Sequence, residues 1–325
     1  MSIDETPPLT LPDLSELNRV DWSQSLRGYV ESVGDYIELD AHHHVLQVGD
    51  GDRLLVTFES AADIRSNQDL GMPYGLLLAQ KLNVTVITII CLKPTWFRAQ
   101  PVYDFFDALT DQGVFDDFEH VCFYGVGLGG YAAAAFSVAA PGSDVVVISP
   151  HATLDPRLTE WDSRFGGIRR LSFTDRYGYA PDMVGAARHA LVLYDPEDDL
   201  DAMHSALFAR PSDAEGLTRF RIRHMGRDLA SVLDEMGILS ATIEAGLSGR
   251  LDLVRFSELY RARREYGPYL RTLLSEVEDL DRPKLVTWLA QSVLERKNMP
   301  RMRRALDRVM DQQRASRAPE QPAAE

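Results

Sequence analysis

Three positions of this sequence stand in the order that a hydrolytic triad requires: Gly127, Asp195 and His224. Such a triad runs nucleophile, acid, base along the chain in one large class of hydrolases. Gly127 is the apex of a glycine turn, 125–130, between an apolar run and an alanine-rich run. A turn of this kind carries the attacking side chain at its apex and needs small residues two positions away on either side. Gly125 and Gly129 meet that need, but the apex itself has no side chain.

The acid and base positions are also altered. Asp195 follows an apolar run and precedes Pro196, which suits a triad acid or an ordinary turn aspartate. The base is usually the second residue of a Gly-His pair, and here the pair is Gly226-Arg227. Arginine stays protonated and cannot accept a proton, so His224 is the remaining candidate. Loss of a triad member costs about 10⁴–10⁶ in kcat, so ordinary serine-hydrolase chemistry is not expected.

Backbone groups for an oxyanion hole remain in the sequence. The N–H of Leu128 is expected to supply one donor, and the loop at 59–61, which contains Ser60 and Ala61, the other. Ser60 and Ser149 are the serines expected near the same edge of the sheet. A role as helix cap or turn residue is favoured for both over a role as displaced nucleophile.

Basic and aromatic side chains are expected beside this edge. Arg65, Trp96 and Arg98 would lie near the strand ends, where they would suit an anionic or sugar-like ligand. The aromatic and basic residues of 161–165 are expected to cap the same crevice.

The glycine turn also fits a second motif. Gly125, Gly127 and Gly130 match the dinucleotide fingerprint G-x-G-x-x-G. Several strands precede the turn, however, whereas the fingerprint normally opens the first βαβ unit. The strand that follows ends in serine and proline, where an acid for the ribose is expected. A nucleotide-binding oxidoreductase is therefore kept only as an alternative.

No metal or cofactor is expected. The histidines of 42–44 would point to alternate faces of a strand and cannot all bind one metal. Asp198, Asp199, Asp201 and His204 are interpreted as a solvated loop that leads into a helix. Cys91 and Cys122, the two cysteines, lie in apolar strand-like runs and are expected to be buried.

The periodicity predicts elements that could position these residues. Strands are expected over 36–40, 44–48, 54–58, 84–92, 121–124, 144–149, 190–194 and 218–224. Helices are expected over 74–81, 101–112, 131–139 and 228–236. A hairpin-like start followed by strand–helix alternation predicts an α/β fold, with a mostly parallel sheet, helices on both faces and an antiparallel beginning.

Four segments follow from this pattern. We expect an acidic lead-in over 1–31, the α/β domain over 32–246, a helical extension over 247–314 and a disordered tail over 315–325. The extension consists of amphipathic helices over 251–264, 269–278, 283–296 and 300–314. It is interpreted as a packing element, with oligomerisation through these helices as one role.

Composition narrows the class of partner. The 325 residues carry a formal net charge of −15, which argues against nucleic acid or an anionic membrane as the main partner. The beginning of the chain lacks the basic and apolar regions of a signal peptide, and no apolar run approaches membrane-spanning length. The expected location is the cytoplasm.

Over 54–239 the sequence resembles the α/β-hydrolase superfamily. The resemblance rests on the strand 54–58, the turn 125–131 and Asp195. It is closest to a bacterial group with Trp-Phe-Arg at 96–98, Tyr-Ala-Ala-Ala-Ala at 131–135 and a segment like 149–156. Members of that group are similar to acyl-hydrolase-like accessory proteins of glycan and surface-protein pathways. Relatives are often labelled phosphoadenosine phosphosulfate reductase, which two buried cysteines do not support.

The combined prediction is a pseudoenzyme. We expect an α/β-hydrolase-like protein that does not catalyse hydrolysis and instead binds a small ligand or a protein partner. The alternatives are an acyl hydrolase or acyltransferase with a displaced nucleophile, and the nucleotide-binding oxidoreductase.

Overall fold

The computed structural model describes residues 10–168, 171–209, 216–226 and 228–317. Within these residues the chain forms two compact units, each held together by its own contacts. The first unit holds the described residues up to Arg223 and those from 228 to Leu259. The second holds His224–Gly226 and the residues from Tyr260 onward. Residues 247–259, the first part of the predicted helical extension, belong to the first unit by their contacts.

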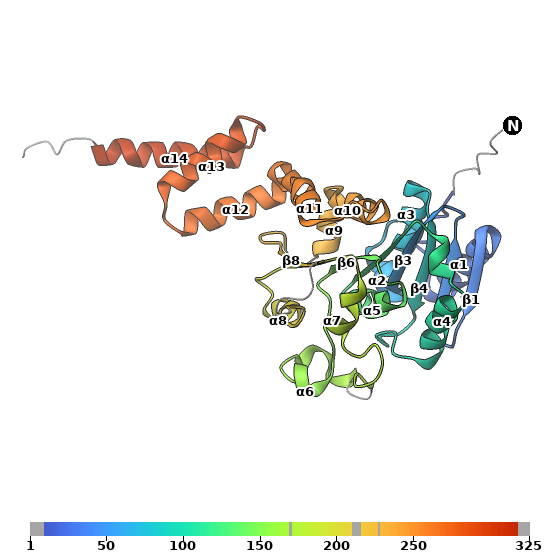
Figure 1. Ribbon diagram of the computed structural model, residues 1–325. Coiled ribbons are helices and arrows are strands. Elements are labelled where there is room, and N and C mark those ends of the chain that lie inside the picture. Colours follow the sequence, from blue (N-terminus) through green and yellow to red (C-terminus); the bar gives the residue numbers. More distant parts are fainter. Residues whose placement is uncertain (1–9, 169–170, 210–215, 227, 318–325) are drawn as a thin grey trace, which may run out of the picture. The chain divides into compact units, whose positions relative to one another are not determined.

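One mixed sheet of eight strands organises the first unit (Figure 1). Its strands are β1 (Gly34–Glu38), β2 (His43–Val48), β3 (Arg53–Ser60), β4 (Thr85–Cys91), β5 (His120–Val126), β6 (Asp144–Ile148), β7 (His189–Tyr194) and β8 (Leu217–Arg221). Their spatial order is β1-β2-β4-β3-β5-β6-β7-β8. β2 runs antiparallel to β1 and to β4, and every other neighbouring pair is parallel. The predicted mostly parallel sheet with an antiparallel start is confirmed.

Burial along the strands explains this arrangement. Every residue of β4 and β6 is buried, as in strands covered by helices on both faces. The edge strands β1 and β8 contain no buried residue. The β-branched runs that predicted central strands therefore occupy the middle of the sheet.

Helices of the first unit follow the strands. They are α1 (Arg19–Val33), α2 (Ala61–Asn67), α3 (Tyr74–Leu82), α4 (Gln100–Asp111), α5 (Leu128–Phe136), α6 (Pro156–Thr159), α7 (Ala180–Met183), α8 (Asp199–Leu207), α9 (Leu229–Glu235), α10 (Ile238–Leu247) and α11 (Leu253–Leu259). Short 3₁₀ turns cover 69–71, 114–117, 137–139, 163–168 and 184–186. Periodicity alone does not predict α2 and α10.

The two faces of the sheet are covered by different helices. On one face Phe58 of β3 stacks on Phe106 of α4 and Phe136 of α5, with ring centroids 5.7 and 5.4 Å away. On the other face α3 approaches so closely that a Cβ on Gly75 would lie 2.7 Å from the Thr57 hydroxyl. α10 lies on this second face as well, because a Cβ on Gly246 would meet the Cys122 sulfur at 2.9 Å.

The expected acidic lead-in contains a packed helix. In α1, Trp22, Leu26 and Val30 are buried. The Trp22 indole N–H donates to the Gly71 carbonyl at 2.7 Å, which ties the helix to the segment before α3. Asn18 caps the helix by accepting from the N–H groups of Val20 and Asp21.

The second unit is helical, as predicted for this end of the chain. A 3₁₀ segment (Tyr260–Glu265) precedes α12 (Gly267–Asp279), α13 (Pro283–Leu294) and α14 (Pro300–Arg317). Their shared core contains apolar residues spaced three or four apart: Leu270, Leu274, Val286, Ala290, Val293, Met302, Ala305 and Val309. None of the described helices has both the length and the apolar character that crossing a membrane requires.

Both cysteines are buried in central strands, as expected. Cys91 ends β4 and Cys122 lies in β5. Burial raises the pKa of Cys91 to about 12 and that of Cys122 well above its usual value. Neither thiol therefore provides a thiolate near neutral pH.

Candidate functional site

The glycine turn forms a nucleophile elbow between β5 and α5. Gly127 has φ 55° and ψ −113°, a strained combination at the sharp bend from strand to helix. A Cβ on Gly125 would lie 2.2 Å from the Gly129 carbonyl oxygen, and one on Gly129 would lie 2.1 Å from that of Phe58. Glycine is thus required on both sides of the apex, as the elbow pattern demands.

The apex itself is not crowded. A Cβ at Gly127 would meet no other atom within 4 Å. Its N–H donates to the Ile148 carbonyl at 2.9 Å, and its own carbonyl accepts from Tyr131 at 3.0 Å. The space for a nucleophilic side chain is therefore present, and the backbone already holds the dihedral angles that such a residue adopts.

The residues expected to supply oxyanion donors lie at the carboxyl ends of β3 and β5. Leu128 is the first residue of α5, so its N–H has no partner within the helix. The parallel register pairs Phe58 with Gly125, and this brings Ser60 and Ala61 alongside the elbow. Ser60 caps α2, since its hydroxyl accepts from the Asp63 N–H and donates to the Asp63 carboxylate. Its hydroxyl is paired with a carboxylate of its own helix and not with a histidine.

Asp195 stands directly after β7, which is the position of a triad acid in this topology. It is buried, and its carboxylate accepts from the Glu197 N–H at 2.9 Å. That bond is typical of an aspartate-stabilised turn. Asp195 therefore occupies the position of a triad acid and at the same time stabilises a turn.

Two residues stand at or near the base position of the sequence, His224 and Arg227, and the structure describes only the first. His224 has φ 63° and belongs to the second unit, where its ring lies 6.4 Å from that of Tyr269. Arg227, the residue at the usual histidine position, lies outside the described residues.

The segment after β6 packs behind the elbow. Ser149 has φ 45° and donates its N–H to Leu193, and the His151 N–H points to the Gly127 carbonyl at 3.4 Å. The His151 ring is buried, with Nδ1 accepting from the Trp96 indole N–H at 3.2 Å. Because indole nitrogen can only donate, Nδ1 carries no proton. Burial, with the nearby His204, lowers the pKa of His151 well below its usual value, so the neutral ring keeps its proton on Nε2.

A second buried histidine stands next to it. His204 of α8 accepts from the Ala152 N–H through Nδ1 at 3.2 Å, and its Nε2 lies 2.9 Å from the Asp162 carboxylate. Burial lowers the pKa of His204 although Asp162 opposes the change. Arg164 pairs with Asp162 and also with Asp201. Both ring nitrogens of His204 are thus engaged in holding the segment behind the elbow.

The sequence pattern indicates the two segments that contribute to this network but does not predict which of their residues pair. It predicts a loop leading into a helix at Asp198 and His204, and Asp198 does cap α8. It predicts a cap over 161–165, and Phe165 packs edge-on against Trp96 and His151. Among the described residues no group of three or more histidine, cysteine or acidic side chains could hold a metal ion.

Arg98 and Trp96 are buried supports. The Arg98 guanidinium donates to the carbonyls of Ser172 and Arg176 and to the Tyr131 hydroxyl, and it pairs with Asp175. These contacts tie the segment 172–177 to α5. The sequence predicts that these two side chains contact a ligand. They have almost no surface with which to do so, because Trp96 and the Arg98 side chain are each 1% exposed.

Arg65 lies apart from them. It is exposed on α2, donates to the Leu17 carbonyl at 3.3 Å and lines a shallow cavity with Trp22.

Glu59 is a polar residue to whose side chain the sequence pattern assigns no role. Its carboxylate accepts from the N–H groups of Tyr74 and Gly75, at 2.7 and 2.9 Å, and from the Thr57 hydroxyl. Burial raises its pKa, while these bonds oppose the change. Glu59 thereby provides acceptors for the N–H groups in the first turn of α3, which have no partner within the helix. The signal in the sequence is an acidic residue directly after the predicted strand 54–58.

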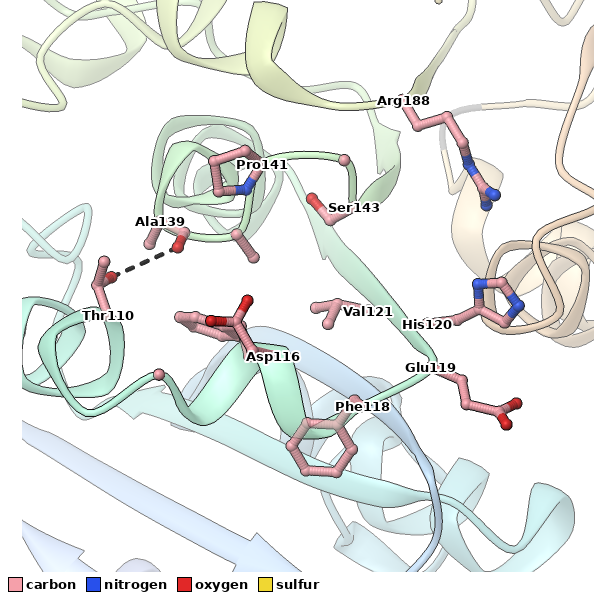
Figure 2. A pocket seen from close by; sticks show the side chains of 14 residues that line it. Thr110, Asp116, Phe118, Glu119, His120, Val121, Ala139, Pro141, Ser143 and Arg188 are labelled. Carbon is pink, nitrogen blue, oxygen red and sulfur yellow. Dashed lines mark hydrogen bonds between the residues drawn. The ribbon is translucent and has the colours of Figure 1, made fainter.

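A cavity of about 470 Å³ lies at the opposite ends of the strands (Figure 2). His120 begins β5, while Ser143 and Arg188 precede β6 and β7, so the cavity is at the amino ends of these strands. Arg188 is paired with Asp144, and Asp116 stands across the cavity from it. Gly127 lies at the carboxyl end of β5, so this cavity is remote from the elbow.

Comparisons with known proteins found similar solved structures at low sequence identity. No protein-family model matches the chain, and no curated protein matches it. It is similar to EstE1, a thermophilic carboxylesterase from a metagenomic library, with 13% identity, a TM-score of 0.43, and 69% of this chain and 97% of that one covered. It is similar to carboxyl esterase 2 of Tuber melanosporum, with 13% identity, TM-score 0.41 and coverages of 66% and 86%. It is also similar to the Gap123 glycosylation-associated complex of Streptococcus agalactiae, with 13% identity, TM-score 0.45 and coverages of 67% and 47%.

The order of the strands, the elbow after β5 and the acid position after β7 together give the architecture. The chain has the α/β-hydrolase fold.

Proposed function

We propose that this protein is a non-catalytic member of the α/β-hydrolase fold that binds a small ligand or a protein partner. The observation that supports this most directly is Gly127, which holds the backbone angles of a nucleophile and has no side chain. A hydrogen atom cannot attack a carbonyl carbon. The residual rate of such a site would come from the oxyanion donors and binding alone.

The histidines behind the elbow favour the same conclusion. A general base needs a ring nitrogen that is free to accept a proton from the nucleophile. In His151 the unprotonated nitrogen already accepts from Trp96, and in His204 it accepts from the Ala152 N–H. Neither histidine can replace the missing base without losing a buried hydrogen bond.

A second candidate function is acyl transfer through a displaced hydroxyl, and one observation favours it. The Thr95 hydroxyl lies 2.6 Å from Nε2 of His43, whose Nδ1 lies 2.9 Å from the Asp40 carboxylate. This is the connectivity of acid, base and hydroxyl. Burial lowers the pKa of His43, with Asp40 opposing the change, so the ring is neutral near pH 7 and Nε2 can accept.

The structural alternative for Thr95 is to support a strained turn. Trp96 and Phe97 both have positive φ, 51° and 56°, and the Phe97 N–H points to the Thr95 hydroxyl at 3.3 Å. A support of this kind needs the hydrogen bonds of Thr95 but no reactivity, and we favour it.

The nucleotide-binding alternative receives less support. The dinucleotide-binding fold places its strands in the order 3-2-1-4-5-6, whereas this sheet has the order β1-β2-β4-β3-β5-β6-β7-β8. A thermal-shift titration with NADH and NADPH tests it, and stabilisation by either would revive it.

Labelling with a fluorophosphonate probe tests the proposal. We expect no covalent adduct on the wild-type chain, as read by peptide mass spectrometry. An adduct at Thr95 that disappears in Thr95→Val, and persists in the matched control Thr110→Val, would establish the second candidate instead. Thr110 suits the control because its hydroxyl donates to the backbone carbonyl of Phe106. An adduct at any serine would also overturn the non-catalytic proposal.

A further inference from the structure

A pocket of about 490 Å³ opens between α3, β5 and α9, on the face of the sheet that α3 covers. Its inner wall consists of two buried tyrosines, Tyr74 at 6% and Tyr124 at 4% exposed. Their ring centroids are 5.4 Å apart and the planes meet at 50°, so the two rings pack against each other, and both residues line the pocket. All residues of the lining belong to the first unit.

The described residues that line this pocket carry charge of one sign. Asp69, Asp234 and Glu235 line it, and the lining that the structure describes includes no lysine, arginine or histidine. Asp234 is exposed and fixed in place by the Tyr74 hydroxyl, which donates to it at 2.6 Å. The pocket is therefore aromatic at its base and acidic at its rim.

The Tyr124 hydroxyl is a further polar group of this pocket, independent of the carboxylates. Tyr124 is 4% exposed and lines the pocket, and its hydroxyl oxygen is not a buried atom. Because this oxygen forms no hydrogen bond with any residue that the structure describes, it is open to a ligand in the pocket. Burial first, and then the nearby carboxylates of Glu59 and Asp234, raise the pKa of this phenol. It remains a neutral group that can still accept a hydrogen bond.

We propose that this pocket binds an alkylammonium group. The faces of tyrosine rings attract organic cations, and desolvation strengthens that attraction. The rim carboxylates supply opposite charge, and the Tyr124 oxygen supplies an acceptor for an ammonium N–H. A bare metal ion fits less well, because the described residues include no set of three or more ligands suited to one. The inference does not depend on whether position 127 is inert.

The pocket volume favours a small group. Ligand cavities of about 300–1,000 Å³ enclose drug-sized molecules, and an alkylammonium of four or five carbon atoms would occupy only part of this one. The same ammonium chemistry is available from a free amine and from a lysine side chain of a peptide. The lining does not discriminate between these sources, so the test includes both.

Saturation-transfer NMR with the full chain tests the inference. The probes are n-butylammonium, tetramethylammonium and the capped peptide acetyl-Gly-Lys-Gly-amide, at constant ionic strength, with tert-butanol as the neutral probe. We expect transfer to at least one cation and none to tert-butanol. Preference for the peptide over the free amines identifies a lysine side chain, and the reverse preference identifies a small amine. Equal transfer to tert-butanol, or none to any cation, overturns the proposal.

Two variants locate the binding. Asp234→Asn removes the charge but can still accept from Tyr74, and Tyr124→Phe removes only the unpartnered hydroxyl. We expect each to weaken binding about three- to tenfold. The matched control is Asp116→Asn, which removes an exposed carboxylate from the cavity of Figure 2 and should leave binding unchanged. Unaltered affinity in both folded pocket variants would refute the assigned site, whatever the result of labelling at the elbow.

Discussion

The Trp96 indole nitrogen lies 3.2 Å from Nδ1 of His151, and both rings are buried behind the elbow. This bond fixes the histidine as a neutral ring that cannot accept a further proton at Nδ1. It joins the strained turn after β4 to the segment after β6. The segments around Gly127 are thus held together by buried hydrogen bonds. Neither His151 nor His204 has a free acceptor nitrogen, and the apex has no nucleophile.

Removing the indole donor should expose the strength of this brace. Trp96→Phe keeps an aromatic ring but leaves Nδ1 of His151 without its donor. We expect the free energy of unfolding to fall by about 1–3 kcal/mol, the cost of an unsatisfied buried polar group, plus the loss of buried ring area. Urea unfolding followed by circular dichroism measures it. Trp288→Phe, at a tryptophan that is 64% exposed, is the control and should change stability by less than about 0.5 kcal/mol.

The three glycines of the elbow should respond differently to alanine. Gly127→Ala meets no neighbouring atom, so its cost is the strained backbone alone, about 1–3 kcal/mol. Gly125→Ala and Gly129→Ala each bring a Cβ to about 2 Å from a carbonyl oxygen, which forces α5 away from β5 in the first variant and away from β3 in the second. We expect these two variants to be far less stable or insoluble, as judged by soluble yield and thermal unfolding. Equal behaviour of all three would show that the turn is not built this way.

Restoring the missing side chain asks whether the rest of the site is competent. The apex has room for a serine, but neither His151 nor His204 offers a free acceptor nitrogen. We expect Gly127→Ser to show no hydrolysis of p-nitrophenyl acetate above that of Gly127→Ala, which serves as its matched control. Measurable turnover by the serine variant alone would mean that a functional base exists and that only the nucleophile was lost.

Asp162 should contribute to stability in a pH-dependent way. Burial opposes ionisation, but bonds from Arg164 and His204 outweigh it and lower the pKa of Asp162 to about 2. A carboxyl group whose pKa is lowered on folding stabilises the fold above its unfolded pKa of about 3.9. That contribution, about 2 kcal/mol, is lost as the pH falls through 4 toward 2. We expect Asp162→Asn to be less stable at pH 7 by about this amount, with the gap to wild type closing below pH 4.

The buried histidines should weaken the fold at mildly acid pH. Folding lowers the pKa of both His151 and His204, mainly through burial, so the unfolded chain binds protons more readily. Their contribution is complete above about pH 6.5 and declines as the pH falls below it. Thermal unfolding between pH 7.5 and 5 should therefore show a falling midpoint. His204→Gln should flatten that fall; a slope unchanged in the variant would argue against a neutral buried ring.

Several features could be predicted from the sequence because they are local. The spacing of Gly125, Gly127 and Gly129 depends on contacts within a few residues, so the sequence of this stretch is enough to predict the elbow. The β-branched runs and their alternation with helices similarly determined the sheet and the position of Asp195 at its edge. These patterns record main-chain geometry, which repeats with a fixed period along strand and helix.

Only the tertiary structure decided which side chains meet. Trp96 and His151 are 55 residues apart, His204 and Asp162 are 42 apart, and Tyr74 and Asp234 are 160 apart. Arg98, which the sequence suggested for a ligand, is instead enclosed by carbonyls of 172–176. Such pairings depend on how whole elements pack, and no period in the chain encodes them. The sequence thus determined that the apex lacks a nucleophile, while packing determined how the nearby histidines and the acidic tyrosine pocket are arranged.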